Sequence, residues 1–156
     1  MSMIKNTLAA AALACLSLAA SAGEVRDKAY FNGASAAATV HFQSSSFDLG
    51  RSSRETLDAL ATAIRSNAAA GHPVANIALY GFADPIGAHV RNDFLASDRA
   101  VTVGAYLGKA LDTTAFTVDS MADAYPVTGC SKADKVAWSG KCLALDRRVE
   151  IIVSFR

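Results

Sequence analysis

The chain contains few of the residues that usually carry catalysis or bind metals. Its 156 residues include three histidines, three cysteines, three prolines and one tryptophan. The histidines are scattered, no CxxC motif or His pair accompanies the cysteines, and Ser44–Ser46 lacks the Gly-x-Ser-x-Gly setting of a nucleophile. His89 falls in a predicted loop, where we expect it to be solvated. With no metal ligands and no nucleophile–base pair in view, we expect neither a cofactor nor an enzyme.

Long apolar runs are confined to the N-terminal 22 residues. Lys5 is the only charge among them, residues 8–20 are apolar or small, and small residues precede Gly23. This pattern predicts a secretory signal peptide over residues 1–22, because the run is shorter than the ~20 residues that span a bilayer. Cys15 keeps a lipoprotein signal open as an alternative.

The sequence also lacks an excess of charge of either sign. Of its 15 lysines and arginines, all but Lys5 follow the predicted signal, and these 14 match the 14 aspartates and glutamates. A chain without net charge has no long-range field to attract nucleic acid or anionic lipid, so we expect no nucleic-acid partner. The remaining residues suffice for one domain with a sizeable core. We place that domain at 39–156, after a linker or N-terminal arm at 23–38.

Cys130 and Cys142 are the two cysteines that follow the predicted signal. An even count in an exported chain indicates a disulfide. Closing this loop would stabilise the fold by ~3 kcal/mol in the chain-entropy model. The signal and the cysteines together predict the periplasm as the location of the protein.

Hydrophobic periodicity predicts helices that alternate with strands. The first helix begins with a capping box between Ser52 and Glu55 and ends at Gly71. The main part of the second helix covers roughly 97–109, with Ser97 as its N-cap, and the pattern leaves open an earlier helical turn at 91–95. Strands are expected at 39–42, 77–81, 116–121 and 147–155, and a short one near 29–31.

The last predicted strand alternates clearly, with Val149, Ile151 and Val153 on one face. Such alternation is typical of a strand with one buried face. The order β-α-β-α-β-β then implies a sheet with both helices packed on it.

The segment 81–100, GFADPIGAHVRNDFLASDRA, is the most informative part of the chain. Asp84 directly follows a predicted strand, and ligands favour the loops beyond strand carboxyl ends. Arg99 would lie in the first helical turn if Ser97 caps the helix, where free backbone N–H groups favour an anion.

These side chains suit a ligand that carries both an ammonium and a carboxylate. Arg99 would bind the carboxylate bidentately and Asp84 the ammonium, while Asn92 braces the loop or donates to the ligand. A structural ion pair between Asp84 and Arg99 is the alternative that the residues alone leave open.

The same segment is similar to the signature of the OmpA-like domains, the OmpA/MotB C-terminal peptidoglycan-binding family. That signature reads roughly G-[YF]-[TA]-D-x-x-G-x(4)-N-x-x-L-S-x-x-R-A. The residues in register are Gly81, Phe82, Asp84, Gly87, Asn92, Leu95, Arg99 and Ala100. Outside it, HFQSSSFDL matches the family's first-strand motif at Phe42 and Leu49, and Tyr125-Pro126-Val127 matches its Pro-Val turn. CLALDRRVEIIV, from Cys142, resembles the end of OmpA's periplasmic domain, including the cysteine pair.

The resemblance implies an α+β sandwich in which two main helices pack on a mixed sheet, with one disulfide. It also implies non-catalytic binding of the cell wall through the meso-diaminopimelate of the peptidoglycan stem peptide. Asp84 would contact the amine of that residue and Arg99 its carboxylate. Arg147 or Arg148 would help at the rim, and the resemblance does not distinguish the two.

The chain departs from the family pattern at several loop positions. Ser44-Ser45 stands for the family's Phe-Asp, and Ala83, which we include in the site, stands for the threonine before the aspartate. Leu95-Ala96 replaces Leu-Ser, and Ser120-Met121-Ala122 replaces Gly-x-Gly. These changes keep a second interpretation open, in which the fold binds an outer-membrane or other envelope protein and has weak or lost wall binding.

Overall fold

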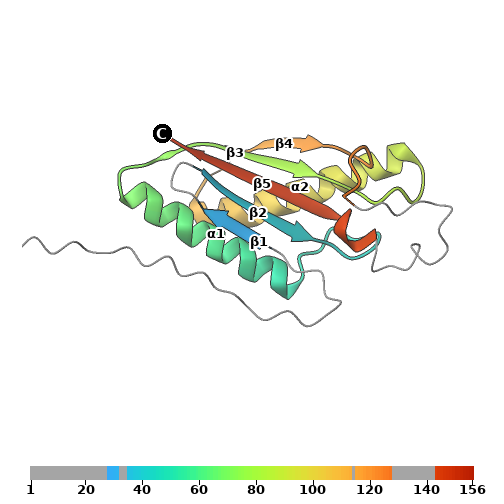
Figure 1. The fold of residues 1–156 in the computed structure, drawn as a ribbon, viewed down its shortest axis with the longest axis horizontal. Coiled ribbons are helices and arrows are strands. Elements are labelled where there is room, and N and C mark those ends of the chain that lie inside the picture. The colour runs from blue at the N-terminus through green and yellow to red at the C-terminus, as the bar shows by residue number, and fades with distance from the viewer. Residues whose placement is uncertain (1–27, 32–34, 114, 128–142) are drawn as a thin grey trace, which may run out of the picture.

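The fold is known here from a computed structural model that describes residues 28–31, 35–113, 115–127 and 143–156. Five strands of these residues form one sheet in the order β1-β2-β5-β3-β4, and two long helices lie on one side of it (Figure 1). The elements are β1 Lys28–Phe31, β2 Ser35–His41, α1 Arg51–Ala69, β3 Val74–Gly81, α2 His89–Leu111, β4 Thr117–Ser120, the 3-10 helix η1 Leu143–Leu145 and β5 Arg148–Phe155. The predicted signal peptide and the disulfide between Cys130 and Cys142 lie outside the described residues.

The sheet is mixed, as predicted. β5 occupies its centre and runs antiparallel to β2 on one side and to β3 on the other. β4 pairs in parallel with β3, since α2 carries the chain back across the sheet between them. The two helices and this mixed sheet confirm the predicted α+β class.

The core lies between the sheet and the helices. Val149, Ile151 and Val153 of β5 are fully buried, which confirms the predicted apolar face of that strand. Ile152 points to the opposite face and keeps 44% of its surface exposed. The helices contribute buried side chains at helical spacing, namely Leu57, Leu60 and Ile64 of α1 and Val103 and Leu107 of α2. Each large apolar side chain buried in this way stabilises the fold by roughly 1.5–3 kcal/mol.

The first helix begins differently from the prediction. Its N-cap is Gly50, no side chain caps it, and the capping box of Ser52 and Glu55 was therefore wrong. Because the helix already starts at Arg51, Ser52 lies inside it. Ser53 is buried instead and donates to the carbonyl of His41 at 3.1 Å, tying α1 to the end of β2.

The second helix begins eight residues earlier than predicted. Gly87, with φ of +103°, turns the chain, and the backbone is helical from His89 onward, with Ala88 as the N-cap. Ser97 is thus an interior residue and was wrongly predicted as the cap. Arg99 lies ten residues after the start of α2. We had expected an anion bound by Arg99 to be favoured by the free N–H groups of the first helical turn. That expectation was wrong, because the effect of the helix dipole falls off within the first turn.

The sheet extends to the N-terminal side of residue 39. The short strand expected near 29–31 is present as β1, and β2 begins at Ser35 rather than Thr39. Both strands pair in register with the rest of the sheet. In the part of the chain that the structure describes, no helix is long and apolar enough to cross a membrane.

A close approach between β3 and α2 fixes the geometry from which the site is built. A Cβ added to Gly81 would lie 1.9 Å from the carbonyl oxygen of Ala96. Only glycine therefore fits at the end of β3. The contact places the segment after β3 directly beside the middle of α2, where Arg99 lies.

Candidate functional site

The candidate site lies at the end of the sheet where β2, β3 and β4 finish and β5 and α2 begin (Figure 1). Phe82 and Ala83 continue β3 beyond its last paired residue, and their N–H groups donate to the carbonyls of Arg148 and Ala122. The chain then turns at Pro85–Ala88 into α2. Asp84 stands at the start of this turn.

Asp84 is buried and its carboxylate is already engaged. Only 8% of the residue is exposed. One oxygen, Oδ1, accepts the N–H of Ile86 at 3.1 Å, which shapes the turn, and Oδ2 lies 3.3 Å from Nη1 of Arg147. The ion pair that Asp84 forms is thus with Arg147 and not with Arg99.

Arg99 has no exposed surface and binds backbone carbonyls. Its Nε donates to Ser46 at 2.9 Å, Nη1 to Phe82 at 3.0 Å and Nη2 to Gln43 at 3.1 Å. These three bonds join the β2–α1 loop, the end of β3 and α2. Arg99 therefore supports the fold of this end of the domain, whatever else it binds.

Burial and neighbouring charges act on Arg99 in opposite directions. Burial, the largest effect, lowers the pKa of its guanidinium from the ordinary value, the negative charge of Asp84 raises it, and the positive charge of Arg147 lowers it, so that the pKa is about 10. A pKa of about 10 leaves Arg99 cationic at neutral pH. Its guanidinium also lies 5.4 Å from the centre of the Phe42 ring, within the range of a cation–π contact.

The structure separates the two arginines of the pair at 147–148. Arg147 is buried, donates from Nε to the carbonyl of Phe42 at 3.1 Å and reaches Asp84. Arg148 stacks on the ring of Phe82 at 3.7 Å and pairs with Glu150 at 2.6 Å. Arg147 thus joins the Asp84 cluster, whereas Arg148 belongs to a neighbouring contact.

Asn92 and Ala83 border this cluster. Asn92 is buried in the first turn of α2, and its Nδ2 donates to Asp123 at 3.1 Å. Ala83 is buried too, and it contributes its N–H to the carbonyl of Ala122 at 2.7 Å. His89 is exposed, as predicted, but it begins α2 rather than lying in a loop, and its Nδ1 lies 2.6 Å from Asp123.

The cluster of Asp84, Arg99 and Arg147 carries one negative and two positive charges in a mostly buried setting. Charges interact more strongly there than in water. The net charge of +1 suits a ligand with a carboxylate. Asp84, the only anion in the cluster, suits an ammonium. In the described ranges, 28–31, 35–113, 115–127 and 143–156, no group of three His, Cys, Asp or Glu side chains is placed to hold a metal.

Two features of this region were missed from the sequence. Asp123 binds both His89 and Asn92, yet nothing in its local sequence marks it. Ala122 adopts φ of +45°, a left-handed conformation that glycine takes most easily. The family's glycine at the corresponding motif position is a signal from which that backbone conformation can be inferred.

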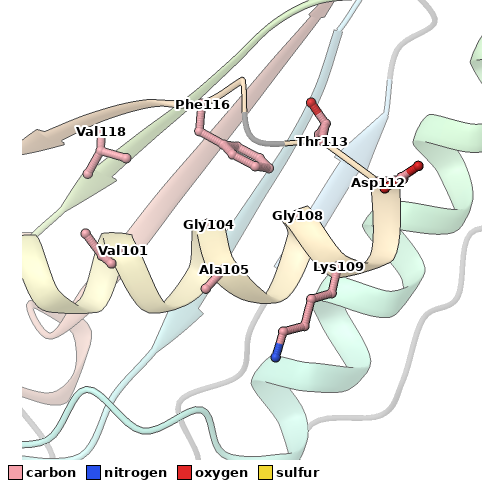
Figure 2. Close-up of a pocket in the computed structure, with 9 residues that line it drawn as sticks. All are labelled: Val101, Gly104, Ala105, Gly108, Lys109, Asp112, Thr113, Phe116 and Val118. Carbon is pink, nitrogen blue, oxygen red and sulfur yellow. The ribbon is translucent and has the colours of Figure 1, made fainter.

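A separate pocket lies between α2 and the edge strand β4. It has a volume of about 650 Å³, and Figure 2 shows Phe116 and Val118 reaching from the β4 side toward the helix. Val101 and Ala105 line its helical side and Lys109 lies at one end. None of the predicted site residues borders this mainly apolar pocket, so it adds nothing to the Asp84 cluster.

The family of the chain follows from a comparison with protein-family models. The model of the OmpA family matches residues 41–137, which is more than half of the 156 residues. The chain belongs to the OmpA family. The matched range includes Asp84, Asn92 and Arg99 of the site, while Arg147 lies beyond it. A search of the curated proteins gave no match.

Solved structures of other OmpA-like domains have the same fold. The peptidoglycan-associated lipoprotein of Burkholderia pseudomallei is 20% identical, with a TM-score of 0.59 over 74% of this chain and 89% of that one. The cell wall anchor of the T6SS of Pseudomonas aeruginosa is 25% identical, with a TM-score of 0.59 over 84% and 89%. The periplasmic domain of Helicobacter pylori MotB is 17% identical, with a TM-score of 0.56 over 81% and 77%.

Proposed function

We propose that this chain is a non-catalytic module that binds peptidoglycan in the periplasm through the diaminopimelate of the stem peptide. In this way it would anchor or organise the cell envelope. The observation that carries the proposal is the cluster of Asp84, Arg99 and Arg147, which lies at the family's motif positions and combines an anion with two cations. Membership of the OmpA family, and the names of the cell wall anchor and the peptidoglycan-associated lipoprotein among similar structures, support it.

The proposed ligand matches the charges of the cluster. The free end of diaminopimelate carries an ammonium, for which Asp84 is the acceptor, and a carboxylate, for which the two arginines are donors. Charge-assisted hydrogen bonds of this kind are about twice as strong as neutral ones. The carboxylate of Asp84 is already paired with Arg147 at 3.3 Å. Binding then requires the ligand to share or replace that contact.

A second candidate function is supported by a specific observation. Arg99 is fully buried and its three backbone contacts leave it no exposed surface. Together with Ser44-Ser45 and Ala83, where the family has other residues, this favours an envelope protein-interaction module in which the cluster is structural. Binding of the unmutated protein to cell walls would exclude that alternative.

Sedimentation with purified sacculi tests the proposal. The unmutated protein should pellet with sacculi, and Asp84→Asn should remain in the supernatant, because asparagine keeps the shape of aspartate but not its charge. Asp98 is an exposed aspartate on α2, so Asp98→Asn is the matched control and should pellet. Circular dichroism of each variant checks that it is folded. Equal pelleting of Asp84→Asn and the parent would contradict the proposed site.

A further inference from the structure

Asp123 bridges two side chains at the start of α2. Its Oδ1 lies 2.6 Å from Nδ1 of His89, and its Oδ2 accepts a 3.1 Å hydrogen bond from Nδ2 of Asn92. The hydrogen bond from His89, as the larger cause, and that from Asn92 lower the pKa of the Asp123 carboxyl below its ordinary value, against the effect of burial. Asp123 is therefore ionised at neutral pH and acts only as an acceptor.

The contact between Asn92 and Asp123 determines which atom of the Asn92 amide faces the turn at residues 84–88. Since a carboxylate cannot donate, the NH₂ group of Asn92 must point to Asp123, and its oxygen points away. That oxygen, Oδ1, lies on the side of Gly87, 3.7 Å from where a Cβ of residue 87 would be. Within the described part of the chain, no group donates to this oxygen. It is an acceptor at the turn that carries Asp84.

The same short segment also holds the other end of the turn. The carbonyl of Ala122, next to Asp123, accepts the N–H of Ala83 at 2.7 Å, directly before Asp84. Residues 122 and 123 thus fix the strand end on one side of the turn and the helix start on the other. The turn between these anchors is mostly exposed at Ile86, Gly87 and Ala88, so its own packing restrains it little.

We propose that Asp123 is a positioning residue for the ligand site. It orients Asn92 so that the amide oxygen faces the turn at Gly87, three residues after Asp84, where it would serve as a second acceptor for the ammonium of the ligand. The proposal rests on the proposed function. It adds a specificity element, because an amide oxygen held in this orientation favours a ligand with an N–H donor and disfavours a second carboxylate.

Calorimetry with two peptides tests this role. One peptide carries diaminopimelate, and the other carries 2-aminopimelate, which keeps the terminal carboxylate but lacks the terminal ammonium. Asp123→Ala should lower the affinity for the diaminopimelate peptide at least fivefold and change that for the analogue less than twofold. Asp98→Ala is the matched control and should change neither. An equal loss for both peptides would overturn the proposal in favour of a purely structural role.

A reciprocal exchange of the two side chains provides a rescue. In the double variant Asn92→Asp with Asp123→Asn, the amide at 123 donates to the carboxylate at 92, which keeps an acceptor facing the turn. Its affinity for the diaminopimelate peptide should return to within threefold of the parent. Failure of this rescue, with the double variant folded, would count against the proposed orientation of Asn92.

Hydrogen exchange measured without ligand separates this proposal from the proposed function. Asp123→Ala should speed exchange of the Ile86 amide at least tenfold, since the turn loses one anchor, and leave the core amides of Leu79 and Ile151 unchanged. Unchanged exchange at Ile86 would overturn the positioning role even if the parent binds cell walls. Conversely, a parent that binds neither peptide would overturn the proposed function and, with it, the ligand role of Asp123, and faster exchange in the variant would then show only that Asp123 anchors the turn.

Discussion

The carboxylate of Asp84 lies 3.3 Å from the guanidinium of Arg147, and each side chain is at most 10% exposed. Asp84 is in the family's motif after β3, whereas Arg147 directly precedes β5. This buried pair joins the turn after β3 to the residue before the central strand, so it links the packing of the sheet to the charge of the candidate site.

Breaking this pair from one side should be costly. Arg147→Met leaves the Asp84 charge buried without its partner, so we expect the free energy of unfolding to fall by about 3 kcal/mol. The double variant Asp84→Asn with Arg147→Met should lose less than the sum of the two single changes. Urea unfolding of all four proteins gives the coupling energy, with Arg51→Met on the exposed first residue of α1 as the control. Additive single effects would contradict a coupled pair.

Arg99→Lys should destabilise the domain although it conserves the charge. A lysine has one ammonium, which cannot reach the carbonyls of Gln43, Ser46 and Phe82 together. Carbonyls left unpaired in a buried site cost ~1–3 kcal/mol each, so we expect a loss of about 3 kcal/mol in urea unfolding. A loss below about 0.5 kcal/mol would show that the three bonds matter little. Because substitutions of Arg99 are expected to destabilise the fold, ligand binding is better tested first at Asp84.

Substitutions at Ala122 should reveal its left-handed backbone. For Ala122→Gly, relief of roughly 1 kcal/mol of strain is offset by the greater chain entropy of glycine and by the loss of a buried methyl group worth ~0.8 kcal/mol. We expect that variant to match the parent within about 1 kcal/mol. Ala122→Val should lose at least ~2 kcal/mol, because a β-branched residue is strained at positive φ. Thermal unfolding measures both, and equal stability of the valine variant would contradict this conformation.

The contribution of Asp123 to stability should depend on pH. A carboxyl whose pKa is lower in the folded than in the unfolded chain stabilises the fold above its unfolded pKa, and this contribution is lost as the pH falls through the folded pKa. The pKa of Asp123 is shifted below 3.8. The difference in unfolding free energy between the parent and Asp123→Asn should thus be full at about pH 5 and shrink below about pH 4. Urea unfolding at several acid pH values measures it, and a constant difference would contradict a lowered pKa of Asp123 in the folded protein.

Periodicity predicted the parts of the fold in which one face is buried. The alternation of Val149, Ile151 and Val153 located the central strand, because a strand with one buried face repeats every two residues. The same parity places Arg147 on the side of the helices and Arg148 on the other. The position of Arg147 on the side of Asp84 could therefore be predicted from the alternation of the strand.

Predictions from local sequence failed where contacts between distant residues determine the structure. Ser52 and Ser97 have the side chains of N-caps, but α1 and α2 begin earlier, after Gly50 and after the turn at Gly87. The pair of Asp84 with Arg147 and the bonds of Asp123 join residues far apart in the chain. No spacing rule within one element predicts such contacts. The motif in 81–100 contains Asp84, Asn92 and Arg99 of the candidate site, but it left the pairing of these side chains undetermined.

Calorimetric titration with stem peptides tests the central claim most directly. A peptide with diaminopimelate should bind the unmutated protein, and a peptide with lysine at that position should bind at least tenfold more weakly, because lysine lacks the carboxylate that the two arginines would receive. Asp84→Asn should lose at least tenfold in affinity for the diaminopimelate peptide, as expected for the loss of about 1.4 kcal/mol or more in charge-assisted contacts. Equal affinity for the two peptides, or no effect of Asp84→Asn, would contradict the account.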